Sequence, residues 1–255
     1  MDLDRRHTIR ESSHRILDPL TPEKLATQGV ALHLPAGTRV LDLACGNGEL
    51  LCTWARDHAV TGTGTATGVD ISTVFVAAAR ERAAELGVAG SVRFEHADAS
   101  SYTSPERVDV ACCLGATWIG GGVPGTLALL EASLRPGGLV LVGEPFWRLD
   151  PPDPAAVAAL APLHASELGW LSLPGLVAQV QGLGWDVVEM VLADEDSWDR
   201  YVAAQWRNVR DWLDANPADE LAAELRDELA TAPLRYVTWQ RPHLGWGVLA
   251  LRRRP

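Results

Sequence analysis

Basic residues are scarce in this sequence relative to acidic ones. Its 255 residues include 22 Lys and Arg against 33 Asp and Glu, which gives a formal net charge of -11. Because an acidic chain repels a phosphate backbone, nucleic acid is not expected as its main partner. No apolar run is long enough to cross a bilayer, and the start "MDLDRRHTIRESSH" lacks the apolar region of a signal peptide. We therefore expect a cytoplasmic protein without a membrane partner.

Cysteine is also rare, with four residues and no Cys-x-x-Cys pair. Cys112 and Cys113 stand inside an apolar run, and Cys45 is expected to be a small packed residue rather than a nucleophile. The pattern indicates reduced, partly buried thiols and argues against structural zinc or another metal site. There is no internal repeat or low-complexity tract. With 47% hydrophobic residues, the chain suits one large domain, or one domain with an elaborated cap.

Strand and helix patterns alternate through the first part of the chain. Strands alternating with helices at this spacing predict an α/β fold, in which a parallel sheet is covered on both faces. We predict strands over 38–45, 66–72, 91–98, 107–116 and 139–145, and helices over 48–59, 72–87 and 126–138.

The pattern differs on either side of this alternation. In the leader, Thr21 is predicted to cap a helix that begins at Pro22. A Pro-rich insertion, irregular or partly helical, follows the fifth strand. Later helices are predicted over 173–185, 197–217 (capped by Ser197) and 218–230, and a closing antiparallel hairpin over 185–194 and 244–254.

A strand ends abruptly at a glycine-bearing turn in "VLDLACGNGE", residues 40–49. Gly46 and Gly48 allow the backbone to approach a ligand closely. Dinucleotides and S-adenosylmethionine are two cofactor classes held by such turns. The dinucleotide motif needs a third glycine, where this chain has Leu51. The motif therefore favours S-adenosylmethionine.

Four segments resemble, in the right order, the motifs of the class I S-adenosylmethionine-dependent methyltransferases. They are "VLDLACGNGE", "GVDIS", "EHADAS" and "LRPGGLVLVGEP". The run "LGATWIGGG" followed by "GEPFW" is similar to a bacterial small-molecule branch of that superfamily. The resemblance implies a Rossmann-like, seven-stranded, mostly parallel sheet with helices on both faces, an antiparallel last strand and a helical cap. It implies a helical leader or lid over 1–37 and a methyltransferase domain over 38–255, with an insertion over 146–172 and cap helices over 197–230.

The resemblance also implies the cofactor S-adenosyl-L-methionine, with S-adenosyl-L-homocysteine as product. Asp42 would accept a hydrogen bond from the cofactor's ammonium, Asp70 from ribose hydroxyls and Asp98 from the adenine amino group. Asp70 and Asp98 could otherwise be ordinary strand-end turn residues. The remaining expected cofactor contacts are Ala44, Cys45, Gly46, Gly48, Ile71, Ala99 and Leu114.

The acceptor is expected beyond the carboxyl ends of the strands, near Trp118 and Trp147. Glu144 would orient the acceptor or act as a base, or it is a structural carboxylate. Tyr201 would line the acceptor pocket, or it only docks its helix. His14 would reach the ligand from the leader.

Methyl transfer by in-line displacement needs mainly proximity, orientation and a dry site. A base is needed only if the acceptor loses a proton. No NPPY-type run follows the fourth strand, which argues further against nucleic-acid bases as acceptors. We expect methyl transfer to an O, N or C nucleophile of a small molecule, by a monomer or homodimer. The alternatives are a tRNA or protein methyltransferase, or a cofactor-binding module without transfer activity.

Overall fold

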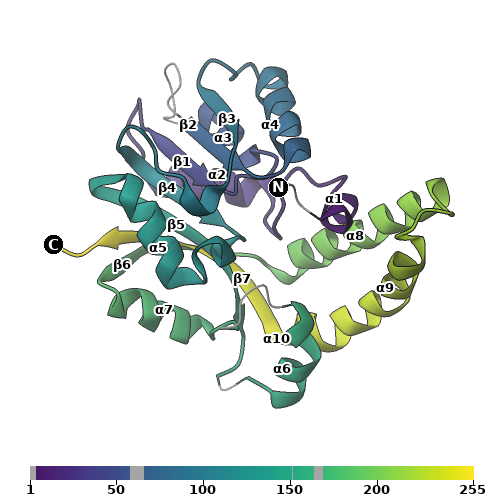
Figure 1. The fold of residues 1–255 in the computed structure, drawn as a ribbon. Coiled ribbons are helices and arrows are strands. Elements are labelled where there is room, and N and C mark those ends of the chain that lie inside the picture. The colour runs from purple at the N-terminus through teal and green to yellow at the C-terminus, as the bar shows by residue number, and fades with distance from the viewer. Residues whose placement is uncertain (1–3, 58–65, 151, 164–168) are drawn as a thin grey trace.

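The computed structural model describes residues 4–57, 66–150, 152–163 and 169–255. Within these ranges seven strands form one sheet in the order β3-β2-β1-β4-β5-β7-β6 (Figure 1). β7 pairs antiparallel with both β5 and β6, and the other neighbours are parallel. The predicted fold class and closing hairpin are confirmed. The strands are β1 (Val40–Leu43), β2 (Ala66–Asp70), β3 (Val92–His96), β4 (Val108–Leu114), β5 (Leu134–Trp147), β6 (Trp185–Leu192) and β7 (Leu244–Arg253).

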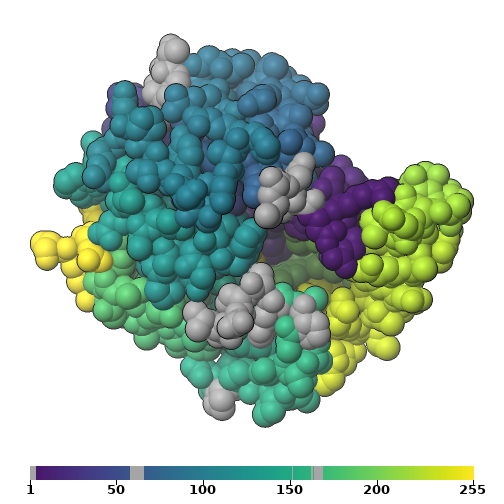
Figure 2. Space-filling model, in the orientation of Figure 1, coloured from purple at the N-terminus to yellow at the C-terminus, as the bar shows by residue number. Residues whose placement is uncertain are grey.

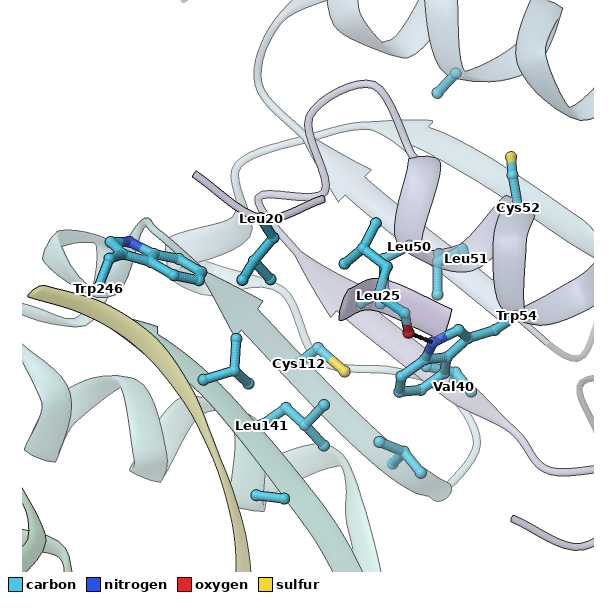
Figure 3. Close-up of a cluster of buried hydrophobic side chains, with 14 of the residues drawn as sticks. Leu20, Leu25, Val40, Leu50, Leu51, Cys52, Trp54, Cys112, Leu141 and Trp246 are labelled. Carbon is cyan, nitrogen blue, oxygen red and sulfur yellow. Dashed lines mark hydrogen bonds between the residues drawn. The ribbon is translucent and has the colours of Figure 1, made fainter. Parts of the chain in front are cut away.

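Helices cover both faces of the sheet because side chains alternate along its buried strands. In β4, Val110 and Cys112 enter one core and Ala111 and Cys113 enter the other. Figure 3 shows the first core, where the Trp54 indole donates to the Leu25 carbonyl at 3.1 Å. That face carries α2 (Pro22–Ala31), α3 (Glu49–Asp57) and α4 (Thr73–Glu85), and the other carries α5 (Val123–Ser133) and α7 (Leu173–Gly182).

A helical cap lies beside the sheet, where α1 packs against α8 and α9 (Figure 1). Ile9 of α1 is buried among Val209, Leu213 and Leu225, so the leader has its own small core with the cap. The cap helices are α1 (Arg5–Arg10), α8 (Glu195–Ala215) and α9 (Ala222–Arg235). The other elements are α6 (Pro154–Leu160), α10 (Arg241–His243), η1 (Ala99–Ser101), η2 (Thr117–Gly120), η3 (Ala161–Leu163) and η4 (Tyr236–Gln240). No helix in the described ranges is long and apolar enough to cross a membrane.

Several predicted boundaries were wrong. The helix predicted over 126–138 runs from Val123 to Ser133, and the next residues already belong to β5. Asp194, not Ser197, caps α8, because its carboxylate accepts the Ser197 N–H at 2.8 Å. The helix predicted over 218–230 begins at Ala222 and ends at Arg235.

The Thr- and Gly-rich run over 61–68 is only partly described. The sequence leaves open whether it forms a longer hairpin-like loop or an extended second strand. Residues 58–65 lie outside the described ranges, and β2 begins at Ala66.

Candidate functional site

A cavity of about 750 Å³ lies at the carboxyl ends of β1 to β4. This volume falls in the usual range of small-molecule sites. One wall comes from the turns that follow these four strands, and the other comes from the leader. Figure 2 shows the leader (purple) at the surface between the α4 region (blue) and the α8–α9 hairpin (green to yellow).

The glycine turn after β1 forms the centre of the wall. Ala44 and Gly46 take left-handed backbone conformations, with φ of 59° and 52°. The Gly46 N–H donates to Asp70 Oδ2 at 2.8 Å, which joins the turn to the end of β2. A Cβ added at Gly46 would lie 2.6 Å from Leu17 Cδ1, so the leader packs directly on this glycine.

Gly48 does not line the cavity. A Cβ at this position would lie 2.4 Å from the ring of Phe94. The missing side chain therefore brings the start of α3 against β3, which is a packing requirement.

Three carboxylates lie at or near the carboxyl ends of three neighbouring strands along the cavity. Asp42 belongs to β1, Asp70 ends β2, and Asp98 follows β3. Asp70 accepts the Ser72 N–H through Oδ1 at 2.8 Å as well as the Gly46 N–H. Asp98 accepts from the Ser100 hydroxyl at 2.7 Å and from its N–H at 2.9 Å, which holds the pKa of Asp98 below its ordinary value.

Asp42 is only 4% exposed, and its carboxylate has no hydrogen-bond partner among the described residues. Burial, together with the charges of Asp70 and Asp18, raises the pKa of Asp42 well above its ordinary value. A buried, unpartnered carboxylate that lines a cavity is suited to a cationic ligand.

The end of β4 and the residues after it form an apolar part of the wall. Leu114 and Ala116 line the cavity there, followed by Trp118 and Ile119 of η2. Trp118 is 47% exposed and therefore lies at the rim.

The leader contributes residues that the sequence reasoning missed. Ile16, Leu17 and Asp18 line the cavity, as do His7 and Arg15. Asp18 is 8% exposed and accepts the Leu20 N–H through Oδ1 at 3.1 Å. Burial raises the pKa of Asp18 to about 7. A single acid inside the apolar run "ILDPL" was a signal that could have identified it.

Nine of the ten predicted cofactor residues line the cavity, all except Gly48, and so does the predicted acceptor residue Trp118. Burial raises the pKa of the Cys45 thiol well above its ordinary value, as expected for a packed residue. The nine cofactor residues are Asp42, Ala44, Cys45, Gly46, Asp70, Ile71, Asp98, Ala99 and Leu114.

Glu144 and Trp147 lie elsewhere. Glu144 borders a separate cavity of about 180 Å³, and its Oε2 accepts from the Thr117 hydroxyl at 2.5 Å. Burial raises the pKa of Glu144 to about 7. Trp147 is 3% exposed and packs edge-on against Trp170, with ring centres 5.9 Å apart.

Tyr201 of α8 and His14 of the leader do not line the cavity, and their contacts join these two segments. The Tyr201 hydroxyl lies 3.0 Å from Glu11 Oε1 and 3.1 Å from the Leu17 carbonyl oxygen. His14 Nε2 donates to the Tyr201 carbonyl at 3.1 Å, and its Nδ1 lies 3.0 Å from Glu11 Oε2. Asn47, in the glycine turn, donates to the His14 carbonyl at 2.6 Å.

The cavity has the chemistry to hold S-adenosylmethionine. Its wall combines a close-approaching backbone turn, the unpartnered carboxylate of Asp42 and further carboxylates at the ends of β2 and β3. The cofactor carries an ammonium, a sulfonium, ribose hydroxyls and an adenine amino group, and each of these is a partner for a carboxylate. The residues present therefore fit the group.

Comparison with known proteins agrees with this reading. A family model described as "Methyltransferase domain" matches residues 40–138. A SAM-dependent methyltransferase from Geobacter sulfurreducens, crystallised with S-adenosyl-L-homocysteine, is 56% identical, with a TM-score of 0.93 and coverage of 99% of both chains. YjhP from Escherichia coli (strain K12) is 54% identical over 251 residues, which cover 98% of this chain and 99% of that protein. The 27-O-demethylrifamycin SV methyltransferase of Amycolatopsis mediterranei (strain S699) is 32% identical over 160 residues, which cover 61% of this chain and 52% of that protein.

The sheet order and the cavity at its strand ends define a Rossmann-like methyltransferase fold. The chain belongs to the S-adenosylmethionine-dependent methyltransferases. It is an enzyme of this family, and S-adenosylmethionine is its cofactor.

Proposed function

We propose that this enzyme transfers a methyl group to an O, N or C nucleophile of a small-molecule acceptor by in-line displacement. The observation that carries the proposal is the cavity of about 750 Å³ that the strand ends and the leader form together. A site covered by the chain's own leader suits a small acceptor that can enter beside the cofactor.

Bound S-adenosylmethionine supplies an activated methyl group on a positively charged sulfur. Asp42 would hold its ammonium, and Asp98 and Ala99 its adenine. Asp70 would accept the ribose hydroxyls, since its carboxylate ends β2 and lines the cavity. These side chains orient the donor, which is the main contribution that this reaction needs from a protein.

The apolar wall would keep water from the reacting groups and receive the acceptor. Ile16 and Leu17 would cover the site, and Trp118 would contact the acceptor at the rim. For Trp147 and Tyr201 we propose packing roles, since neither lines the cavity. Tyr201 would hold the leader in place through its contact with the Leu17 carbonyl.

For Glu144 and His14 we propose positioning roles. Glu144 would fix η2, and with it Trp118, through its hydrogen bond from Thr117. His14 would fix the leader between α8 and the glycine turn. In-line transfer needs no base when the acceptor nucleophile has a free electron pair and can lose its proton later to water.

The charge of the chain and its similarity to a known methyltransferase favour a small-molecule acceptor over tRNA or protein. The chain carries a net charge of -11, which repels RNA phosphates. A relative 32% identical is named for methylation of a rifamycin, which is a small molecule. We further propose a cytoplasmic location, which the four free cysteines fit, and a monomeric or homodimeric state.

Calorimetric titration with S-adenosylmethionine, followed by incubation with methyl-labelled cofactor and fractionated metabolites, tests the proposal. Binding of the cofactor and labelling of a metabolite would support it. Cofactor binding with transfer to no metabolite fraction would favour a binding module without transfer activity.

A further inference from the structure

The leader places one more carboxylate at the cavity than cofactor binding requires. Asp18 lines the same cavity as Asp42 and is also more than nine-tenths buried. Its Oδ1 accepts the Leu20 N–H, and no hydrogen bond to Oδ2 is found among the described residues. Asp18 lies outside the motifs that follow the strands.

The neighbours of Asp18 show which end of the cavity it occupies. Asp98, Asp70 and Asp42 stand over β3, β2 and β1, and neighbouring parallel strands are about 4.8 Å apart. Asp18 acts on Asp42, because its charge contributes to the raised pKa of that residue. Leu17, the preceding residue, packs on Gly46 in the turn after β1. Asp18 therefore belongs to the β1 end of the cavity, away from Asp98.

A second observation indicates that the β1 end of the cavity is suited to a positively charged ligand group. Asp42 is buried, faces the cavity and has no hydrogen-bond partner among the described residues. Two buried carboxylates close to each other repel, and a cation between or beside them relieves the repulsion. One cationic group of a ligand would neutralise the carboxylate of Asp42. A second cationic group of the ligand would then be needed to neutralise Asp18.

We propose that Asp18 is a specificity-determining residue that recognises the positive charge on the sulfur of the methyl donor. The inference rests on the proposed function of the cavity. S-adenosylmethionine and S-adenosyl-L-homocysteine share the ammonium, ribose and adenine, and differ by a methyl group and by the charge on sulfur. Asp42, Asp70 and Asp98 would hold groups common to both molecules, and Asp18, which also lines the cavity, would hold the group that differs.

The location of Asp18 gives this recognition a consequence. Asp18 belongs to the leader that covers the turn, between Leu17 and the Leu20 N–H. A donor with a charged sulfur would hold the leader closed through Asp18. A product with a neutral sulfur would lose that contact, so the leader would favour donor binding and product release.

The test is calorimetric titration of the full chain with S-adenosylmethionine and, separately, with S-adenosyl-L-homocysteine. The Asp18→Asn variant removes the charge and keeps the shape. We expect the ratio of donor affinity to product affinity to fall by about tenfold, since a charge pair at close range is worth this much or more. Asp18→Glu restores the charge and should recover part of the ratio.

Two controls separate charge from packing. Leu17→Ala loosens the leader without changing charge and should weaken both ligands, and the donor more than the product. Asp98→Asn acts at the other end of the cavity, and it should weaken the two ligands alike and leave the ratio unchanged. An unchanged ratio in Asp18→Asn, with both ligands still binding, would overturn the inference alone. If the unaltered chain bound neither ligand, the proposed function would fall as well.

Discussion

The side chain of Leu17 lies directly over Gly46, so that a Cβ on the glycine would come within 2.6 Å of Leu17 Cδ1. This contact joins the leader to the turn after β1. The Tyr201 hydroxyl, 3.1 Å from the Leu17 carbonyl oxygen, joins the same residue to α8. The leader, which covers the cavity, is therefore held by the glycine turn on one side and by α8 on the other.

Gly46→Ala should reduce binding of S-adenosylmethionine more than it reduces stability. The backbone conformation, with φ of 52°, already disfavours alanine, by about 1 kcal/mol. The added methyl would also displace Leu17 and open the leader. We expect a loss of affinity of about tenfold or more, measured by calorimetry.

Gly87→Ala is the matched control for this substitution. Gly87 has a φ of 69°, and a Cβ there would meet nothing within 4 Å. It should show a similar loss of thermal stability with no change in affinity. Equal affinities for the two variants would contradict the role given to the Leu17–Gly46 contact.

Asp70→Ala should abolish most cofactor binding. The substitution removes the proposed ribose acceptor and also leaves the N–H groups of Gly46 and Ser72 without their carboxylate. We expect affinity to fall by about a hundredfold, together with a loss of roughly 1–3 kcal/mol in the free energy of unfolding. Calorimetry and thermal unfolding by circular dichroism measure the two effects. Unaltered affinity in a folded variant would refute the ribose role.

Glu144→Gln should stabilise the protein at high pH. Burial raises the pKa of Glu144 from 4.5 to about 7, so the folded chain keeps this proton to a higher pH than the unfolded chain does. The associated stability is fully present below pH 4.5 and is lost as the pH rises through about 7. At pH 8.5 the neutral glutamine should gain about 1 to 3 kcal/mol over glutamate, while at pH 5 the two should be nearly equal. Thermal melts at both pH values provide the measurement, and a pH-independent difference would contradict the argument.

The preference for donor over product should depend on pH. Burial raises the pKa of Asp18 to about 7. The hydrogen bond from the Leu20 N–H lowers this pKa, and the charge of Glu11 raises it. Asp42 and Tyr201 also interact with the Asp18 carboxyl. A cationic ligand favours the ionised form, so donor affinity should rise between pH 5.5 and about 7.5 and then level off. Asp42 affects both ligands alike, since both carry the ammonium. The affinity ratio should therefore rise with pH in the unaltered chain and stay flat in Asp18→Asn, and a sloping ratio in the variant would assign the effect to another group.

Some residues of the site could be predicted from the sequence because their positions depend on local structure. Asp70 and Asp98 stand at or just after strand ends, and Gly46 stands in a turn, so their positions follow from the strand pattern. Gly48 could not be assigned in the same way, because its neighbour Phe94 comes from a strand far along the chain.

The residues that sequence reasoning missed depend on tertiary packing. Asp18 reaches the cavity only because the leader is held by Tyr201 on one side and Asn47 on the other. Conversely, Glu144 lies near the carboxyl end of β5 but borders a second cavity, since η2 lies between it and the larger one. Local pattern gives the end of a strand, and the packing of neighbouring segments decides which cavity a side chain there enters.

The most direct test of the account is transfer of a labelled methyl group. The protein is incubated with methyl-labelled S-adenosylmethionine and a cell extract, and the products are separated by dialysis, with Asp70→Ala as the control. After unreacted S-adenosylmethionine is removed by chromatography, we expect labelled product in the dialysable small-molecule fraction with the unaltered protein and almost none with the variant. Label retained in protein or RNA, or no label in any fraction despite cofactor binding, would contradict it.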